Sequence, residues 1–251
     1  MNSDERLSRS RLLLGDDTMA RLQSARVILF GVGGVGSWAA EALVRTGLRH
    51  ITIVDNDNVA PSNINRQLPA TIDTVGHLKV EALKKHLLTV NPDAEITAVA
   101  SPYTPDTAHE FGIENYDYVI DAIDSLSCKA QLILHSTRLK GVKLFSSMGA
   151  ALKLDPTRVR VAEFWNVQGC PLARALRQRF KRTGQRPSRK FKCVYSDELV
   201  ANRGSLPQDT PGGQWDSSKA AINGSLLQVT GTVGFTLASL VIADLISSPA
   251  K

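Results

Sequence analysis

The sequence predicts an α/β fold built on a doubly wound, mainly parallel sheet, and two observations point to it. Short apolar runs alternate with amphipathic stretches of helical length over the first 150 residues. Strands joined by crossover helices produce this alternation. The glycine-rich stretch GVGGVG, at 31–36, separates the first apolar run from the first helical stretch. Together these features are typical of a Rossmann-like sheet. We expect the carboxyl-terminal half to diverge from it and to be partly antiparallel.

The elements of the first half follow from the spacing of apolar residues and from stop signals. Gly47 ends the first helical stretch, and Asn91 with Pro92 ends the second. We expect strands at 26–30, 50–55, 95–100, 116–124 and 142–149, and helices at 37–47, 78–92 and 128–141.

The rhythm changes after residue 149. The second half predicts an exposed strand at 158–164, a basic helix at 170–184, a mobile loop at 205–218 rich in Gly, Pro, Ser and Asp, and a long apolar helix at 222–246.

Length and composition predict a single domain over 1–251, with a nucleotide-binding half at about 25–150 and a substrate-side half at about 151–251. Hydrophobic residues make up 43% of the chain, which excludes wholesale disorder. The three cysteines, Cys128, Cys170 and Cys193, form no C-x-x-C pair, which excludes a four-thiolate zinc site within the chain. The polar amino terminus is not a secretory signal, so we expect a cytoplasmic protein.

The terminal helix has an alternative interpretation. Residues 226–242 carry no charge, and a stretch of this length is at the lower edge of a bilayer span. Gly, Ser and Thr dilute its apolar character, so we expect a buried core helix and no stable membrane span. Membrane association through this helix, or an exposed interface helix, stays a minor alternative.

Positive charge is concentrated in one segment. Residues 174–192 hold nine basic side chains and no acidic one, whereas the remainder of the chain has 21 basic and 24 acidic residues. Such a segment suits a contact with a polyanion, because attraction to phosphate is long-ranged. A solvated surface that keeps the protein soluble is the alternative.

The glycine stretch supplies a nucleotide motif. Gly31, Gly33 and Gly36 form G-x-G-x-x-G between a strand and a helix, which lets backbone N–H groups approach a phosphate. Asp55 ends the next strand, where a carboxylate can hold ribose hydroxyls. These residues leave open whether the nucleotide is NAD or ATP. A P-loop is excluded because G-x-x-x-x-G-K-[ST] is absent from the sequence.

The residues that follow favour a triphosphate. The loop DNDNVAPSNINRQ, at 55–67, ends in Arg66 and Gln67, Lys79 comes 13 residues after that arginine, and Asp124 ends the fourth predicted strand. A triphosphate site needs cations and a carboxylate for magnesium, whereas a nicotinamide needs little charge nearby.

In this order the motifs resemble the adenylating domain shared by ubiquitin-activating enzymes and their bacterial relatives, over about 130 residues. The resemblance implies that ATP and magnesium bind, that Arg66, Lys79 and Asp124 are catalytic, and that Asp124 is the magnesium ligand. It also implies that Asp55 binds ribose and that Asn63, Arg66 and Lys79 hold phosphates. The nucleotide-binding set is Gly31, Gly33, Gly34, Gly36, Asp55, Asp57, Asn63, Arg66, Lys79 and Asp124.

Over residues 6–246 the chain closely resembles one branch, the tRNA threonylcarbamoyladenosine dehydratases. The motifs are GVGSWAAEALVRTG, YVIDAIDS and KCVYSDE, the last preceded by the basic helix. The branch uses ATP to activate the carboxylate of threonylcarbamoyladenosine in tRNA, and ring closure to a cyclic ester (a hydantoin or oxazolone form) then expels AMP. The resemblance implies a homodimer, in which Arg6 or Arg9 of the partner reaches the phosphates. The expected tRNA contacts are Arg174, Arg177, Arg179, Lys181, Arg182, Arg186, Arg189 and Lys190.

The chain departs from its relatives at one point, because positions 218–220 hold no cysteine where they commonly have one. A thioester or persulfide step there is therefore not expected. Cys193 is expected to be structural or to line the site, although Lys190 and Lys192 could lower its pKa. One alternative function is adenylation of the carboxyl-terminal glycine of a ubiquitin-like sulfur carrier, with a sulfur-transfer or carrier-protein partner. Another is a nucleotide-binding scaffold or redox protein that binds NAD.

Overall fold

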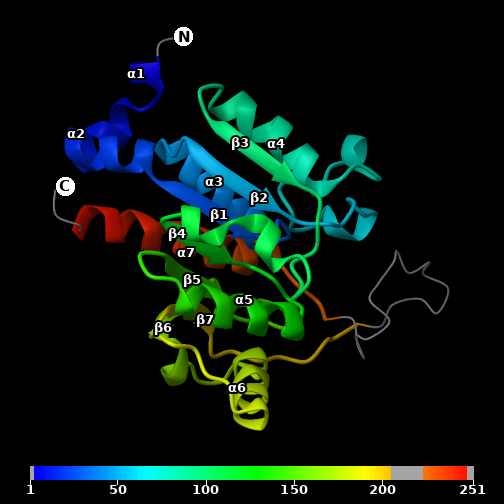
Figure 1. Cartoon of the computed structure of the whole chain (residues 1–251). Coiled ribbons are helices and arrows are strands. Elements are labelled where there is room, and N and C mark those ends of the chain that lie inside the picture. Colours follow the sequence, from blue (N-terminus) through cyan, green and yellow to red (C-terminus); the bar gives the residue numbers. More distant parts are fainter. Residues whose placement is uncertain (1–2, 205–222, 248–251) are drawn as a thin grey trace.

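A seven-stranded sheet runs through the molecule in the order β3-β2-β1-β4-β5-β7-β6 (Figure 1). The computed structural model describes residues 3–204 and 223–247, so the loop expected at 205–218 lies outside the described residues. The strands are β1 (Arg26–Phe30), β2 (His50–Val54), β3 (Glu95–Val99), β4 (Tyr118–Asp121), β5 (Lys143–Ser147), β6 (Val159–Glu163) and β7 (Lys192–Ser196).

The strand pairing confirms the predicted fold class. Every neighbouring pair is parallel except β6 and β7, which are antiparallel. The chain goes outward from β1 through β2 to β3, then crosses back to β4 on the other side of β1. The strand order therefore reverses between β1 and β4, and ligands of doubly wound folds bind outside the carboxyl ends of the strands at such a point.

Helices cover both faces of the sheet (Figure 1). One face packs against α3 (Gly36–Thr46), α4 (Lys79–Val90) and α7 (Leu227–Ser247), and the other against α5 (Leu126–Arg138) and α6 (Pro171–Thr183). Side chains alternate between the two cores along β1, where Val27 and Leu29 face the first and Ile28 and Phe30 face the second. This alternation is the period-two pattern of a strand that is buried on both sides.

The terminal helix α7 belongs to the core, as expected. Among the described residues it is the one helix long and apolar enough to cross a membrane, but it packs along α3 and buries Val233, Leu237 and Val241. A Cβ on Gly234 would lie 2.4 Å from the carbonyl oxygen of Val35, so glycine is what permits this close approach. The apolar composition of α7 is therefore explained by its burial in the protein.

Some elements were missed or misplaced by sequence reasoning. The amino-terminal helices α1 (Ser3–Arg6) and α2 (Ser8–Ser24) were not expected, nor was β7 as a strand. Polar residues dominate α2, which breaks at Gly15 (φ 75°) and buries few side chains, so it shows no apolar period. The strand expected at 116–124 ends at Asp121, because the Ile123 N–H bonds the Asp121 carboxylate and turns the chain. Short 3-10 helices lie at Pro61–Asn63, Ile72–Thr74, Ala108–Phe111, Ile113–Asn115, Pro156–Arg158 and Phe164–Asn166.

Candidate functional site

The glycine loop connects β1 to α3, and two of its glycines are required by geometry. Gly31 has φ 88°, and a Cβ there would lie 2.7 Å from the Ala122 carbonyl oxygen. A Cβ on Gly36 would lie 1.8 Å from the Gly31 carbonyl oxygen. A Cβ on Gly33 would have its nearest neighbouring atom 3.6 Å away, so the fold could accept a side chain at this position. The amino terminus of α3 follows this loop and favours an anion.

Asp55 lies just beyond β2 and is held in place by the loop. Its carboxylate accepts the N–H of Val32 at 2.8 Å and that of Asp57 at 2.9 Å. Burial raises the pKa of Asp55 above its ordinary value, and the positive charge of Lys79 opposes that shift. Asp55, the residue predicted to contact ribose, is thus hydrogen-bonded to Val32, the second residue of the glycine loop.

Lys79 and Asp57 form an ion pair beside Asp55. The Lys79 Nζ lies 2.7 Å from Asp57 Oδ2, and the lysine side chain is 7% exposed. The Lys79 backbone N–H also donates to the Asp57 carbonyl at 3.0 Å, at the start of α4. The structure therefore brings together two of the predicted nucleotide ligands and leaves the Asp57 carboxylate largely exposed.

Arg66 and Asp124 lie close enough for their charges to interact. Arg66 Nη1 donates to the Ser62 carbonyl at 2.9 Å and to Asn65 Oδ1 at 2.8 Å. Its carbon stem crosses Gly34, where a Cβ would lie 3.1 Å from the Arg66 Cγ. Burial lowers the pKa of Arg66, and the negative charge of Asp124 partly restores it. Asp124 is exposed beyond the end of β4, so the segments that follow β1, β2 and β4 lie at one edge of the parallel sheet.

Asn63 is buried below this group and orders the loop. Its Oδ1 accepts the N–H of Ala60 at 3.0 Å, at the start of a 3-10 turn. Trp38 Nε1 donates to the Arg66 carbonyl at 3.0 Å, which ties the same loop to α3. The side-chain oxygen of Asn63 therefore stabilises the fold of the loop. Its side-chain NH2 group is the part that could contact a phosphate.

The basic segment divides into side chains that stabilise the fold and side chains that face outward. Arg177 donates to the carbonyls of Phe164 and Val167 at 3.2 and 3.0 Å. Arg189 donates to four carbonyls at the end of α5 and the start of β5, including that of Thr137 at 2.9 Å. These two guanidinium groups are already bound by backbone oxygens. Arg174, Lys181, Arg182, Arg186 and Lys190 are exposed, and Arg179 is half-buried.

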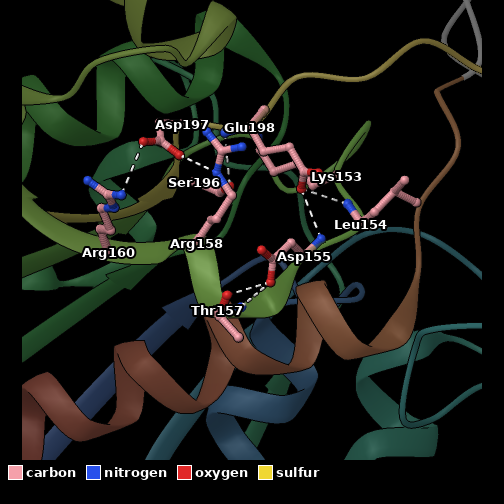
Figure 2. Close-up of polar contacts among 9 residues, drawn as sticks. All are labelled: Lys153, Leu154, Asp155, Thr157, Arg158, Arg160, Ser196, Asp197 and Glu198. Atoms are coloured by element: carbon pink, nitrogen blue, oxygen red, sulfur yellow. Dashed lines mark hydrogen bonds and ion pairs between the residues drawn. The ribbon is translucent and has the colours of Figure 1, made fainter.

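The KCVYSDE motif holds the chain segment that follows β5 (Figure 2). Glu198 Oε2 accepts the N–H groups of Leu154 and Asp155 at 2.8 and 2.9 Å. Asp197 pairs with Arg158 at 2.8 Å and with Arg160 at 3.5 Å, while the Lys153 ammonium donates to the Glu198 carbonyl (Figure 2). The two acidic residues of the motif therefore fasten β6 and the segment before it to the end of β7.

A first prediction concerns Glu198. Its two backbone N–H donors, Asp155 first and Leu154 second, hold its pKa below the ordinary value of 4.5. A lowered acidic pKa stabilises the folded state above pH 4.5, and the effect is lost as the pH falls through the folded value. We expect Glu198→Gln to lower the thermal unfolding midpoint at pH 7, with the difference closing in acid. A melting series across pH, with exposed Glu110→Gln as control, checks this; a pH-independent difference would contradict it.

Cys193 is a buried structural thiol. It is 0% exposed on β7, and burial raises its pKa well above the ordinary value. The expected lowering by Lys190 and Lys192 is wrong, because the cation that acts on this thiol is Lys129. Cys128 is half-buried on α5. A thiol held protonated is a poor nucleophile, so nothing in this environment activates Cys193.

At the amino terminus the structure distinguishes Arg6 from Arg9. Arg6 pairs with Asp93 of its own chain, whereas Arg9 is exposed on α2. Sequence reasoning missed two charged residues near the site, Asp121 and Lys129, which pair at 2.9 Å with both side chains fully buried. The first aspartate of the DAIDS motif was a signal for Asp121, but Lys129 occupies a core position of an amphipathic helix that offered no such signal.

Carboxyl-terminal loops of three neighbouring strands thus place glycines, carboxylates and an arginine around one point where the strand order reverses. This arrangement defines a nucleotide-binding protein of the doubly wound α/β class. The chain belongs to the ThiF family, which matches residues 7–248, and within it to the group of tRNA threonylcarbamoyladenosine dehydratases.

Similarity to that group extends over nearly the whole chain. The tRNA threonylcarbamoyladenosine dehydratase of Haemophilus influenzae is 33% identical over 98% of this chain and 95% of its own length. The structure of the Escherichia coli tRNA N6-threonylcarbamoyladenosine dehydratase in complex with ATP is 33% identical, with a TM-score of 0.83 over 97% of this chain and 95% of that one. The same protein is also known in complex with AMP. By contrast, an adenylyltransferase and sulfurtransferase of Ogataea parapolymorpha matches 59% of this chain and 37% of its own length.

Proposed function

We propose that this protein dehydrates threonylcarbamoyladenosine in tRNA at the expense of ATP. The observation that carries the proposal is the match over 97% of the chain to a dehydratase that binds ATP, joined to the convergence of Gly31, Asp55, Arg66 and Asp124 at one edge of the sheet. This site suits a nucleotide polyphosphate, since it combines a glycine loop, a helix amino terminus and cations.

In the first step, an oxygen of the substrate carboxylate attacks the α-phosphorus of ATP, and the bond to pyrophosphate breaks. Arg66 and Lys79 neutralise negative charge that develops on the phosphates, and Asp55 orients the ribose. The product is a mixed anhydride between the substrate and AMP. Both reactants are held on one protein surface, so the attack benefits from proximity.

In the second step, a nucleophilic atom of the same threonylcarbamoyl group attacks the activated carbonyl carbon, AMP leaves with one carboxylate oxygen, and an N–H of the threonylcarbamoyl group releases its proton to solvent. The ring closes within the substrate, so no enzyme nucleophile is needed. The buried, protonated Cys193 agrees with this. Over both steps the nucleoside loses one water, while ATP is converted to AMP and pyrophosphate.

Asp124 is the residue proposed to hold magnesium with ATP. Magnesium is commonly bound by one or two carboxylates together with substrate phosphates and waters. Asp124 fits that pattern, because it is exposed next to Arg66, and the described residues contain no cluster of three metal-ligating side chains that would make a separate cage. When bound, the ion would neutralise phosphate charge during the attack.

Mass spectrometry of nucleosides is the direct test of this function. tRNA that carries linear threonylcarbamoyladenosine is incubated with the protein, ATP and magnesium, and then digested to nucleosides. We expect that nucleoside to lose the mass of one water only when ATP is present. An unchanged nucleoside despite intact ATP binding would favour carrier-protein activation, which pyrophosphate exchange with a Gly-Gly carrier would then test. A fluorescence titration with NADH against ATP tests the redox alternative.

We propose that the outward side chains of the basic segment contact the tRNA backbone. Reversing the charge of Arg179, Lys181 and Arg182 is expected to weaken tRNA binding and to reduce the salt dependence of log Kd by about one unit for each phosphate that the variant no longer neutralises. Filter binding across a salt series measures both. Reversal of Arg49, Lys84 and Lys85, three basic residues outside this segment, is the matched control. If the variant with reversed charges bound tRNA as tightly as wild type, the segment would be interpreted as a solvated surface with no role in tRNA binding.

We further propose a cytoplasmic homodimer in which Arg9 of one copy reaches the phosphates bound by the other. Arg9 is favoured over Arg6 because Arg6 already pairs with Asp93 of its own chain. A sulfur-transfer or carrier-protein partner is an additional proposal from the family relationship. Sedimentation of the purified protein tests the dimer, and mixing Arg9→Ala with Asp124→Asn chains tests sharing: a mixed dimer that regains activity has one intact composite site.

A further inference from the structure

A buried polar network lies directly beneath Asp124. Asp121 ends β4, Ser146 is its register partner on β5, and Lys129 reaches Asp121 from the first turn of α5. All three residues are 0% exposed. The Lys129 Nζ lies 2.9 Å from Asp121 Oδ2, and the Ser146 hydroxyl donates to the same oxygen at 2.7 Å.

The network holds both backbone polar groups of a single residue, Ile123. The Ile123 N–H donates to Asp121 Oδ1 at 3.1 Å. The Ile123 carbonyl accepts from the Lys129 Nζ at 2.9 Å. Because this carbonyl belongs to the peptide that joins Ile123 to Asp124, the lysine fixes the backbone from which the Asp124 side chain extends.

The other side of the same turn contacts the glycine loop. The Ala122 N–H donates to the Phe30 carbonyl at 2.8 Å, and the Ala122 carbonyl lies where a Cβ on Gly31 would be 2.7 Å away. The turn at 121–124 is therefore held between the end of β1 and the start of α5. Its conformation sets the position of Asp124 relative to the loop that receives phosphates.

Cys193 completes a polar row across three strands. Asp121 is in register with Ser146, and Ser146 is in register with Cys193 on β7. The charges of Lys129 and Asp121 both act on the Cys193 thiol, so the three groups are neighbours. The cysteine of the KCVYSDE motif therefore lies beside the network. No chemical step is assigned to this cysteine.

A buried ion pair is a poor way to stabilise a fold, since apolar residues of similar size often serve as well or better. We propose that Asp121, Lys129 and Ser146 are positioning residues, which hold the turn at 121–124 so that Asp124 meets the magnesium and phosphates of bound ATP. This inference rests on the proposed role of Asp124. It assigns a function in metal-dependent nucleotide binding to residues whose side chains are fully buried.

The test uses the paired variant Asp121→Asn with Lys129→Met, which keeps side-chain size and leaves no unpaired buried charge. Calorimetry measures the Kd for ATP with and without magnesium, and mass spectrometry measures turnover. We expect the gain in ATP affinity caused by magnesium, and the turnover, each to fall about 10–100-fold. Affinity for ATP without magnesium should change little, and the thermal midpoint should stay near that of wild type. The control is Lys143→Met with Asp244→Asn, which makes the same two changes in a partly exposed ion pair of 2.6 Å at the opposite end of β5.

A paired variant that is folded, and whose ATP affinity responds to magnesium as in wild type, would overturn the proposal. If the paired variant does not fold, Ser146→Ala decides, because it keeps both charges and removes one hydrogen bond to Asp121. A smaller loss of the magnesium effect then supports the proposal, and no loss overturns it. A failure of the proposed function shows differently, as wild-type protein that binds ATP with magnesium but leaves the tRNA nucleoside unchanged.

Discussion

Replacing Asp124 by asparagine is expected to lower dehydration turnover about a thousandfold, because metal stabilisation of transition-state charge contributes several kcal/mol. ATP should still bind, more weakly, since the hydrogen bond from the Val32 N–H of the glycine loop to Asp55 is kept. Single-turnover mass spectrometry of the nucleoside and calorimetry with ATP measure the two effects separately.

The matched control is Asp106→Asn, an exposed carboxylate on the segment after β3. It makes the same chemical change away from the convergence of β1, β2 and β4, so turnover should be that of wild type. If Asp124→Asn turned over as fast as wild type, Asp124 would lose its role with magnesium. The network that holds the turn at 121–124 would then lose its proposed purpose.

Gly36→Ala is expected to destabilise the protein by about 3 kcal/mol and to abolish ATP binding. The added Cβ would be placed 1.8 Å from the carbonyl oxygen of Gly31, which is backbone and has no rotamer to change. The loop or the start of α3 must move, and both form the turn proposed to bind phosphate. Denaturant unfolding and a nucleotide titration give the two readouts.

Gly33→Ala in the same loop separates the fold from the ligand. Its Cβ would meet nothing closer than 3.6 Å, so the protein should stay as stable as wild type. ATP affinity should still fall, because a methyl group would occupy the space through which a phosphate approaches the backbone. Equal unfolding curves for Gly36→Ala and wild type would show that the loop relaxes freely, which would contradict the steric argument.

The parallel half of the fold could be predicted from sequence because apolar runs buried on both sides and amphipathic helices leave a clear period. Strands β1, β2 and β3 start where the pattern placed them. Helix α2 could not be predicted in this way, since a helix with only Thr18, Met19 and Leu22 buried has almost no apolar face. Strand β7 was not predicted because its residues belong to the KCVYSDE motif, whose polar residues were interpreted as functional.

The residues proposed to bind nucleotide could be selected from sequence because they lie in short motifs next to strand ends, and strand ends of a parallel sheet meet at one edge. Two residues of the basic segment could not be assigned in this way. Arg177 and Arg189 look the same in sequence as Arg182, yet they bind backbone carbonyls. A charge count gives the sign of a side chain. Whether that side chain donates hydrogen bonds to backbone carbonyls depends on the tertiary structure, which brings distant segments of the chain beside it.

The close approach of α7 to the glycine loop has a consequence for synthesis of the chain. Thr230 lies beside Gly34, and Gly234 packs against Val35, so the last helix supports the first loop of the site. Chains emerge from the ribosome amino terminus first. A nascent or proteolysed chain that stops before residue 227 contains every polar residue proposed to hold ATP, but lacks the surface that keeps their loop in place. We therefore expect nucleotide binding to begin only after residues 227–247 have been synthesised and have packed against the loop.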